Sequence, residues 1–127
     1  MRPQYHFRNS SQGLRSWNIL RLVELSRGLV RVPVPLSAIR ELDEPYWSSG
    51  REHPLTCREI ADHAHLISEC DLDFPIILSS ESRVMDGMHR VCKALNLGLE
   101  TVQAVRFTQD PKPDYIGVNP DDLPYID

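Results

Sequence analysis

The sequence predicts a single α+β domain, residues 1–127, in which helices pack on a small mixed sheet. Residues 55–70 have the spacing of an amphipathic helix. Residues 74–87 have the pattern of a β-hairpin, a second helix follows at once, and residues 101–107 have the pattern of a strand. A chain of 127 residues can bury one core, and 41% hydrophobic with 25% charged residues is ordinary for a globular protein.

The first part of the chain is predicted to be less regular. Residues 1–13 lack periodicity and are expected to form an irregular basic arm ahead of a core of residues 14–107. A helix is expected within residues 16–29, where Gly28 can end it. One face of this helix would carry Ile19, Leu22, Val23 and Ser26.

The segment that follows favours an edge strand and a loop. Residues 30–36 are β-branched but contain Pro33 and Pro35, which permit only an edge or irregular strand. A short helical turn is expected next. The loop after it is marked by Pro45, Gly50 and Pro54.

The two later helices have clear end signals. Thr56 is a good N-cap with Glu59 three residues later, the capping-box pattern, and Gly98 can end a helix of about residues 88–97. The core-facing side of the first helix is expected to be Cys57, Ile60, Ala64 and Ile67. That of the second is expected to be Met88, Val91, Cys92 and Leu95.

The net charge of −4 is unevenly distributed. Residues 1–40 carry seven arginines and one acid, residues 41–107 carry six bases and twelve acids, and residues 108–127 carry five aspartates and one lysine. A basic N-terminal part could contact an anionic partner, whereas the acidic body should repel a polyanion. Nucleic-acid binding is therefore disfavoured but stays open.

No apolar run approaches the roughly 20 residues that cross a bilayer, and the N-terminus lacks the apolar stretch of a secretory signal. We therefore expect a cytoplasmic protein without membrane contact. Cys57, Cys70 and Cys92 lack the spacing of a disulfide framework or a zinc site. We expect reduced, mostly buried thiols and no structural metal.

The proline-rich acidic tail, residues 108–127, is expected to be either disordered or an extended strap. In a strap, four side chains would pack on the body: Tyr115, Ile116, Leu123 and Tyr125. Trp17 and Trp47 are expected to be packing residues.

Residues 84–95, VMDGMHRVCKAL, change from strand-like to helix-like within a short turn. A helix N-terminus presents unpaired N–H groups and the positive end of the dipole, which suits a phosphate. Gly87 can bring the backbone close to a ligand, and Arg90 can grip phosphate oxygens in a bidentate way. The same residues also fit a plain turn, in which Asp86 caps the helix and Arg90 pairs with a surface acid.

Two more basic side chains follow this turn. Lys93 lies three residues after Arg90 and four after His89, so the three share one helix face. That face would lie opposite the core-facing side.

Residues 74–107, FPIILSSESRVMDGMHRVCKALNLGLETVQAVRF, resemble the ParB/sulfiredoxin-like superfamily, also called the ParB-like nuclease domain. Its members run strand, turn, strand, a Gly-x-(His or Arg)-Arg turn, a helix ending in Leu-Gly and a final strand, and the order here is the same. A weaker likeness extends back to residue 30, through VPVPLSAIREL and TCREIADHAHLI. The resemblance implies the superfamily's fold and nucleotide phosphates held at Gly87, Met88, His89 and Arg90.

The turn is most similar to that of the superfamily's small-molecule kinases, which use Asp-Gly-x-His-Arg and an acid after the first strand. This likeness implies a nucleotide (ATP, ADP or CTP) with Mg²⁺, a small-molecule substrate, and catalytic roles for Glu41, Asp86 and His89. Phosphoryl transfer mainly needs positioning and charge neutralisation, with a carboxylate that orients the hydroxyl.

In the superfamily the helix at residues 55–70 faces the nucleotide. His63 and His65 lie on its polar side with Arg58 one turn before them, so the resemblance implies contacts from these residues. Lys93, which shares the helix face of Arg90, is expected to contact the same phosphates.

Other branches fit less well. Sulfiredoxins carry a catalytic cysteine where this chain has Met88, and a thioether cannot replace a thiolate. Chromosome-partitioning ParB proteins follow the module with a helix-turn-helix domain, whereas residues 108–127 are proline-rich, so centromere binding is not expected.

Three functions stay open. The first is nucleotide binding, with or without phosphoryl transfer. The second is a DNA-binding or nuclease module, with contacts from Arg2, Arg8, Arg15 and Arg21. The third is a non-catalytic protein-interaction domain, and a homodimer is compatible with each.

Overall fold

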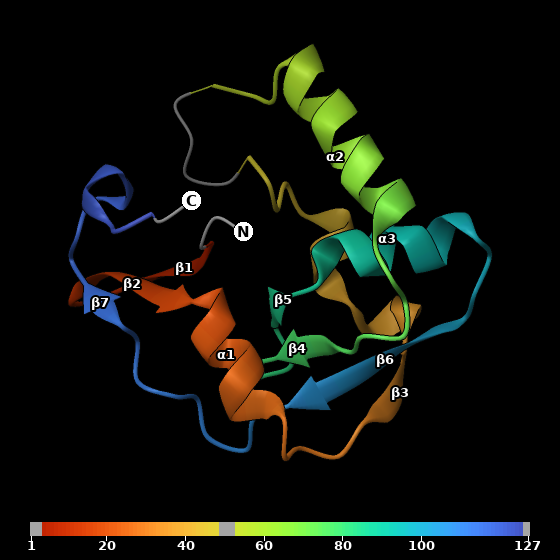
Figure 1. The fold of residues 1–127 in the computed structure, drawn as a ribbon, viewed down its shortest axis with the longest axis horizontal. Helices are drawn as coiled ribbons and strands as arrows, with labels where there is room; N and C mark the ends of the chain where they lie inside the picture. The colour runs from red at the N-terminus through yellow and green to blue at the C-terminus, as the bar shows by residue number, and fades with distance from the viewer. Residues whose placement is uncertain (1–3, 49–52, 126–127) are drawn as a thin grey trace.

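The structure is a computed structural model that describes residues 4–48 and 53–125 (Figure 1). These residues form a mixed α+β fold with two small sheets and three α-helices, which confirms the predicted α+β class. Of the residues singled out in the sequence, Arg2 and Gly50 lie outside the described ranges. No described helix is long and apolar enough to span a membrane.

The larger sheet has four strands in the order β3-β6-β4-β5. Their bounds are Val32–Pro35 for β3, Ile76–Leu78 for β4, Val84–Asp86 for β5 and Thr101–Arg106 for β6. Strands β4 and β6 are parallel, and the other neighbours are antiparallel. The predicted hairpin and final strand are therefore confirmed. The two prolines of β3 lie in an edge strand, where missing N–H donors are tolerated.

The helices are α1 (Ile19–Ser26), α2 (Cys57–Glu69) and α3 (Met88–Asn96). Helix α1 starts later than residue 16 because Asn18 is its N-cap, accepting from the N–H groups of Leu20 and Arg21. The predicted capping box of α2 is present, and the left-handed Gly98 follows the end of α3. Two short 3-10 turns, η1 (Leu36–Ala38) and η2 (Arg40–Asp43), form the predicted helical turn.

The smaller sheet has the order β1-β2-β7. Its strands are β1 (Tyr5–Ser10), β2 (Gly13–Asn18) and β7 (Tyr115–Ile116). The predicted irregular arm is therefore wrong, because most of residues 1–13 belong to a hairpin. The apolar alternation is missing because His6 and Arg8 fill the inward positions of β1, where both contact the buried ring of Trp17.

The tail is the extended strap rather than a disordered segment. Strand β7 pairs with β2, Leu123 is buried, and the Tyr115 and Tyr125 rings pack against Tyr5. Ile116 is the exception among the four predicted packing residues, because its side chain is exposed.

Two hydrophobic clusters lie on opposite faces of the larger sheet. In β4, Ile76 and Leu78 belong to the cluster beneath α3, whereas Ile77 belongs to the cluster beneath the β1–β2 hairpin and α1. Because both faces are covered, β4 is a continuous apolar run.

The predicted inner side of α2 is wrong. No residue of α2 is buried, and Ile60 is 55% exposed. Helix α2 extends along the outside of the molecule with its C-terminal end beside α3 (Figure 1). Polar groups join the two helices: the rings of His63 and His89 are hydrogen-bonded, and Lys93 donates to the carbonyl of Cys70. The apolar residues of α2 therefore never reach the core.

The inner side of α3 is partly as predicted. Met88 and Val91 are buried, but Ala94 completes the stripe, Cys92 is only half-buried and Leu95 is 52% exposed. Packing on the sheet thus follows the i, i+3, i+6 row. The expectation of mostly buried thiols is also wrong, because Cys57 is exposed and Cys70, like Cys92, is half-buried; all three thiols are free.

Candidate functional site

The turn between β5 and α3 requires glycine. Gly87 is the N-cap of α3 and has φ of 106°. A Cβ added to Gly87 would lie 2.7 Å from Cγ2 of Ile76 and 2.9 Å from Nη2 of Arg90. Because glycine has no side chain, it cannot accept from the N–H groups of the first turn of α3, and these groups are left for solvent or a ligand.

Arg90 is held beside this turn. Its Nη2 donates to the carbonyl of Pro75 at 3.1 Å and to Oδ2 of Asp86 at 3.2 Å. Its side chain is 18% exposed, and its Nε is buried without a hydrogen-bond partner among the described residues. Asp86 therefore pairs with Arg90 rather than capping α3. The pair brings one cation and one carboxylate to the helix start.

Lys93 connects α3 to α2. Its Nζ donates to the carbonyl of Ser68 at 3.0 Å and to that of Cys70 at 2.7 Å. These carbonyls belong to the C-terminal end of α2, where a cation is favoured by the helix dipole. Lys93 thus fastens α2 to α3 and is not directed at the turn.

Three aromatic rings stack between the loop after η2, α2 and α3. The Trp47 ring lies 4.2 Å from the His63 ring and 4.8 Å from the His89 ring, with interplanar angles of 22° and 19°. Nδ1 of His63 and Nε2 of His89 are 2.8 Å apart, so one ring donates and the other accepts. Burial, reinforced by His63, lowers the pKa of His89 to about 4. At neutral pH His89 is an uncharged ring beside the first turn of α3.

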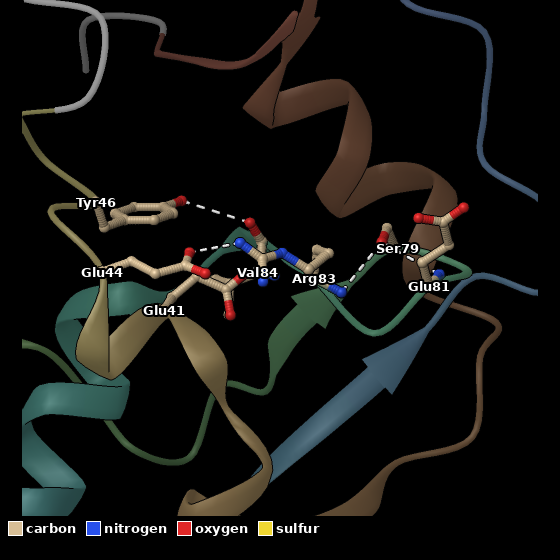
Figure 2. Close-up of polar contacts among 7 residues, drawn as sticks. All are labelled: Glu41, Glu44, Tyr46, Ser79, Glu81, Arg83 and Val84. Carbon is tan, nitrogen blue, oxygen red and sulfur yellow. Dashed lines mark hydrogen bonds and ion pairs between the residues drawn. The ribbon is translucent and has the colours of Figure 1, made fainter.

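Glu41, the predicted acid, is buried with an exposed fraction of 3%. Its Oε2 accepts from the N–H of Val84 at 2.7 Å and pairs with Nε of Arg83 at 3.2 Å (Figure 2). Its Oε1 is buried and has no hydrogen-bond partner among the described residues. Arg83 also pairs with Glu44, so two carboxylates share one guanidinium.

A cavity of about 190 Å³ opens between the loop after η2 and the start of α3. Its walls include Glu41, Leu42, Tyr46, Trp47, Leu55 and Met88. Burial, with Asp86 and Glu41 adding to it, raises the pKa of Tyr46 to about 12, so this residue stays a neutral phenol. The cavity therefore has mainly aromatic and apolar walls, with the buried Glu41 and the more exposed Glu44 among its lining residues.

The predicted residues are only partly brought together. Glu41 and Met88 line the cavity, and Asp86, Gly87 and Arg90 form the adjoining turn. His63 and His89 lie in the aromatic stack. Arg58 is exposed on the first turn of α2.

Sequence reasoning missed three contributors to the site: Trp47, Tyr46 and Arg83. The separations explain this, since Arg83 is 39 residues from its partner Glu44 and His63 is 26 residues from His89. One local indication of this site is present in the sequence, because His63 and His89 lie on the polar sides of their predicted helices.

Among residues 4–48 and 53–125, no three His, Cys, Asp or Glu side chains are grouped so that they could hold a metal ion. Comparison of the chain with protein-family models, curated proteins and solved structures finds no match.

Proposed function

We propose that this protein is a cytoplasmic nucleotide-binding domain of the ParB/sulfiredoxin-like type, which holds phosphate groups at the start of α3. The observation that carries the proposal is the glycine-opened first turn of α3 with Arg90 fixed beside it. Unpaired N–H groups, a helix dipole and a nearby guanidinium are the elements of a phosphate site. The resemblance of residues 74–107 to the superfamily supports the same site.

The proposal extends to phosphoryl transfer to a small molecule. The cavity lined by Glu41 adjoins the phosphate-binding turn, because Met88 is both a cavity wall and the first residue of α3. In this extension Glu41 orients the acceptor, and His89 and Asp86 contact the transferred group. Positioning of this kind is most of what phosphoryl transfer needs from a protein.

A Mg²⁺ ion would have to come with the nucleotide. Mg²⁺ is commonly held by one or two carboxylates together with substrate phosphates. Asp86 is the carboxylate at the turn, and Oδ2 of Asp86 is already engaged by Arg90. Within residues 4–48 and 53–125, Asp86 is thus the carboxylate that this turn offers to Mg²⁺, and binding through the phosphates is the arrangement that fits.

The test is thermal unfolding with adenine, cytosine, guanine and uracil nucleotides, with and without Mg²⁺. The variants are Arg90→Lys, which keeps the charge but loses the planar fork, and Arg27→Ala, a control that removes the exposed arginine directly after α1. A nucleotide at 100 times its Kd should stabilise the protein by about 2.7 kcal/mol.

We expect one base to raise the unfolding temperature of the wild type and of Arg27→Ala, with a reduced shift in Arg90→Lys. The absence of a shift with every nucleotide would refute the binding proposal. Binding without turnover of any nucleotide would refute the transferase extension while leaving the binding proposal intact.

The nucleic-acid alternative is weakened by the tail. Arg8 pairs with Asp110 and Arg21 pairs with Asp114, so two of the four arginines assigned to DNA contacts are neutralised by the strap. Binding of single- or double-stranded DNA at low salt, with a steep loss as salt is raised, would restore this alternative.

A protein-interaction domain is the second candidate, and α2 is the observation that favours it. This helix has no buried residue, and Ile60 and Leu66 are exposed on it. The chain's own second copy is the simplest partner to test. A dimer by light scattering that dissociates in Ile60→Glu would support this candidate, and a monomer at all concentrations would contradict the homodimer.

A further inference from the structure

The two described sheets have four edges, and the edge at β3 is closed to a further strand by proline. The N–H of Leu36 donates to the carbonyl of Glu100, which sets the phase of the pairing between β3 and β6. Pro33 and Pro35 therefore stand at the positions whose N–H groups would point to the outer edge. Because proline has no N–H, this edge offers no donors there.

Two other edges are closed in different ways. At β5, the N–H of Val84 donates to Oε2 of Glu41, and its carbonyl accepts from the hydroxyl of Tyr46 at 3.5 Å (Figure 2). Turn η2 and the loop after it thus cover the edge of the larger sheet. At the smaller sheet, β7 has only two residues. Proline, covering loops and short edge strands are common ways in which proteins prevent edge-to-edge pairing.

The edge at β1 has none of these features. Strand β1 is six residues long, contains no proline and ends the β1-β2-β7 sheet. The N–H of Ile19 donates to the carbonyl of Gln4, so the even-numbered residues of β1 form the hydrogen-bonded pairs with β2. The N–H and C=O groups of Tyr5, Phe7 and Asn9 therefore point to the outer edge, where no described residue bonds to them.

The side chains of β1 do not protect this edge. Arg8, which carries the charge of the strand, turns to the inner face, where it pairs with Asp110 and lies over the Trp17 ring. Phe7 is 38% exposed on the opposite face. A long edge strand with free backbone groups and an exposed aromatic residue is the kind of edge that pairs with another chain.

An antiparallel pair of two β1 strands is symmetric about one residue, and Phe7 is the residue that fits. With Phe7 opposite Phe7 of the second copy, Tyr5 lies opposite Asn9, and each outward N–H and C=O group gains a partner. Arg8 then lies opposite His6, whose pKa burial lowers to about 4, so that this ring is uncharged at neutral pH. A pair centred on Arg8 would place two guanidiniums opposite each other, which is unfavourable.

We propose that the protein forms a homodimer in which the β1 strands of two copies pair antiparallel about Phe7, so that the two three-stranded sheets become one continuous sheet. The interface is isologous, because the same edge serves in both copies. Main-chain hydrogen bonds supply the affinity, and the two Phe7 rings form a cross-strand aromatic pair. This interface is independent of the phosphate site at the start of α3 and of the exposed side of α2.

Sedimentation equilibrium from about 1 µM to about 1 mM tests for this dimer, and we expect one that dissociates on dilution. Phe7→Pro removes the outward N–H but keeps the ladder with β2, because this N–H takes no part in it. Phe7→Lys places two like charges opposite each other. Each variant should weaken the dimer at least about tenfold, which corresponds to two main-chain hydrogen bonds. Val30→Lys is the control, at a residue that is 80% exposed and outside both sheets, and its dimer should be unchanged.

Amide hydrogen exchange of the wild type gives a readout that does not depend on the folding of a variant. In the dilute monomer, the N–H groups of His6 and Arg8 should be protected by β2, whereas those of Tyr5, Phe7 and Asn9 should exchange freely. At concentrations at which the protein is dimeric, the exchange of these three N–H groups should slow at least about tenfold.

A monomer at every concentration would overturn the proposal. A dimer that both Phe7→Pro and Phe7→Lys leave intact would do the same, as would a dimer in which Tyr5, Phe7 and Asn9 still exchange freely. A dimer that dissociates in Ile60→Glu but not in Phe7→Lys would assign the interface to α2 instead.

Discussion

Replacement of Gly87 by alanine tests how the start of α3 is built. The left-handed backbone of Gly87, with φ of 106°, disfavours any L side chain. The added Cβ would also lie 2.7 Å from Cγ2 of the fully buried Ile76, a contact that forces the neighbours to move. Strain and overpacking therefore act at the same position.

Each effect has its own magnitude. Forcing an L residue into the left-handed region costs about 1–2 kcal/mol. Overpacking a core contact adds about 1–3 kcal/mol. We therefore expect Gly87→Ala to lower the free energy of unfolding by about 2–5 kcal/mol, a large part of the stability of an ordinary domain.

Two other glycines separate these effects. Gly98, at the end of α3, has φ of 74° but nothing within 4 Å of an added Cβ, so Gly98→Ala should cost about 1–2 kcal/mol from strain alone. Gly28, after α1, lies outside the left-handed region and also has open space. Gly28→Ala should change stability by less than about 1 kcal/mol and in the stabilising direction.

Urea unfolding followed by tryptophan fluorescence measures all three variants. The effect of alanine on the unfolded chain is similar in each and cancels in the comparison. The expected order of destabilisation is Gly87→Ala, then Gly98→Ala, then Gly28→Ala. If Gly87→Ala were no more destabilising than Gly98→Ala, the close packing of the turn on Ile76 would be refuted.

Three further changes test other contacts. Lys93→Met removes two hydrogen bonds to the end of α2. Amide hydrogen exchange should become roughly tenfold faster in α2 and stay unchanged in β6. Equal acceleration in both elements would contradict this prediction. Burial, then Arg8, lowers the pKa of His6 from 6.5 to about 4, so the unfolded chain takes up the proton first and stability falls as the pH drops from 6.5 to 4. Urea unfolding at pH 7 and pH 4.5 measures this loss of stability, and His6→Phe should reduce it. An equal loss in the wild type and in His6→Phe would contradict the assignment to His6. Burial raises the pKa of Asp110, but Ser80 and Arg8 outweigh it and hold the pKa low, so this stabilisation is present at neutral pH and lost in acid. Asp110→Asn should cost about 1 kcal/mol at pH 7 and less at pH 3, and an equal cost at both would refute the assignment.

The elements with local signals could be predicted from the sequence. The capping box at Thr56, the hairpin of β4 and β5, and the glycine after α3 are all present. The edge position of β3 follows from its prolines. Each of these features depends on residues that are close in the chain, so the sequence pattern contains the whole cause.

The wrong predictions for the N-terminal strands and for α2 have one cause, which is polar contacts with other elements. Strands β1 and β2 were missed because their inward positions include His6, Arg8 and Arg15, which break the apolar alternation. His6 and Arg8 contact the ring of Trp17 on the paired strand, and Arg8 also pairs with Asp110, which is 102 residues away in the chain. The predicted inner side of α2 is wrong for a related reason. Lys93 and His89 hold this helix by polar contacts, so its apolar residues stay outside the core.

The sequence by itself determined the strand–turn–helix unit around Gly87, because caps, turns and short-range periodicity act between neighbours. The tertiary structure decided the chemistry beside that unit. It buried Glu41 against Val84, 43 residues away, and left one carboxylate oxygen without a partner. It also stacked Trp47 on His63 and His89. Such long-range contacts depend on how separate elements pack in three dimensions, and no short stretch of sequence contains that information.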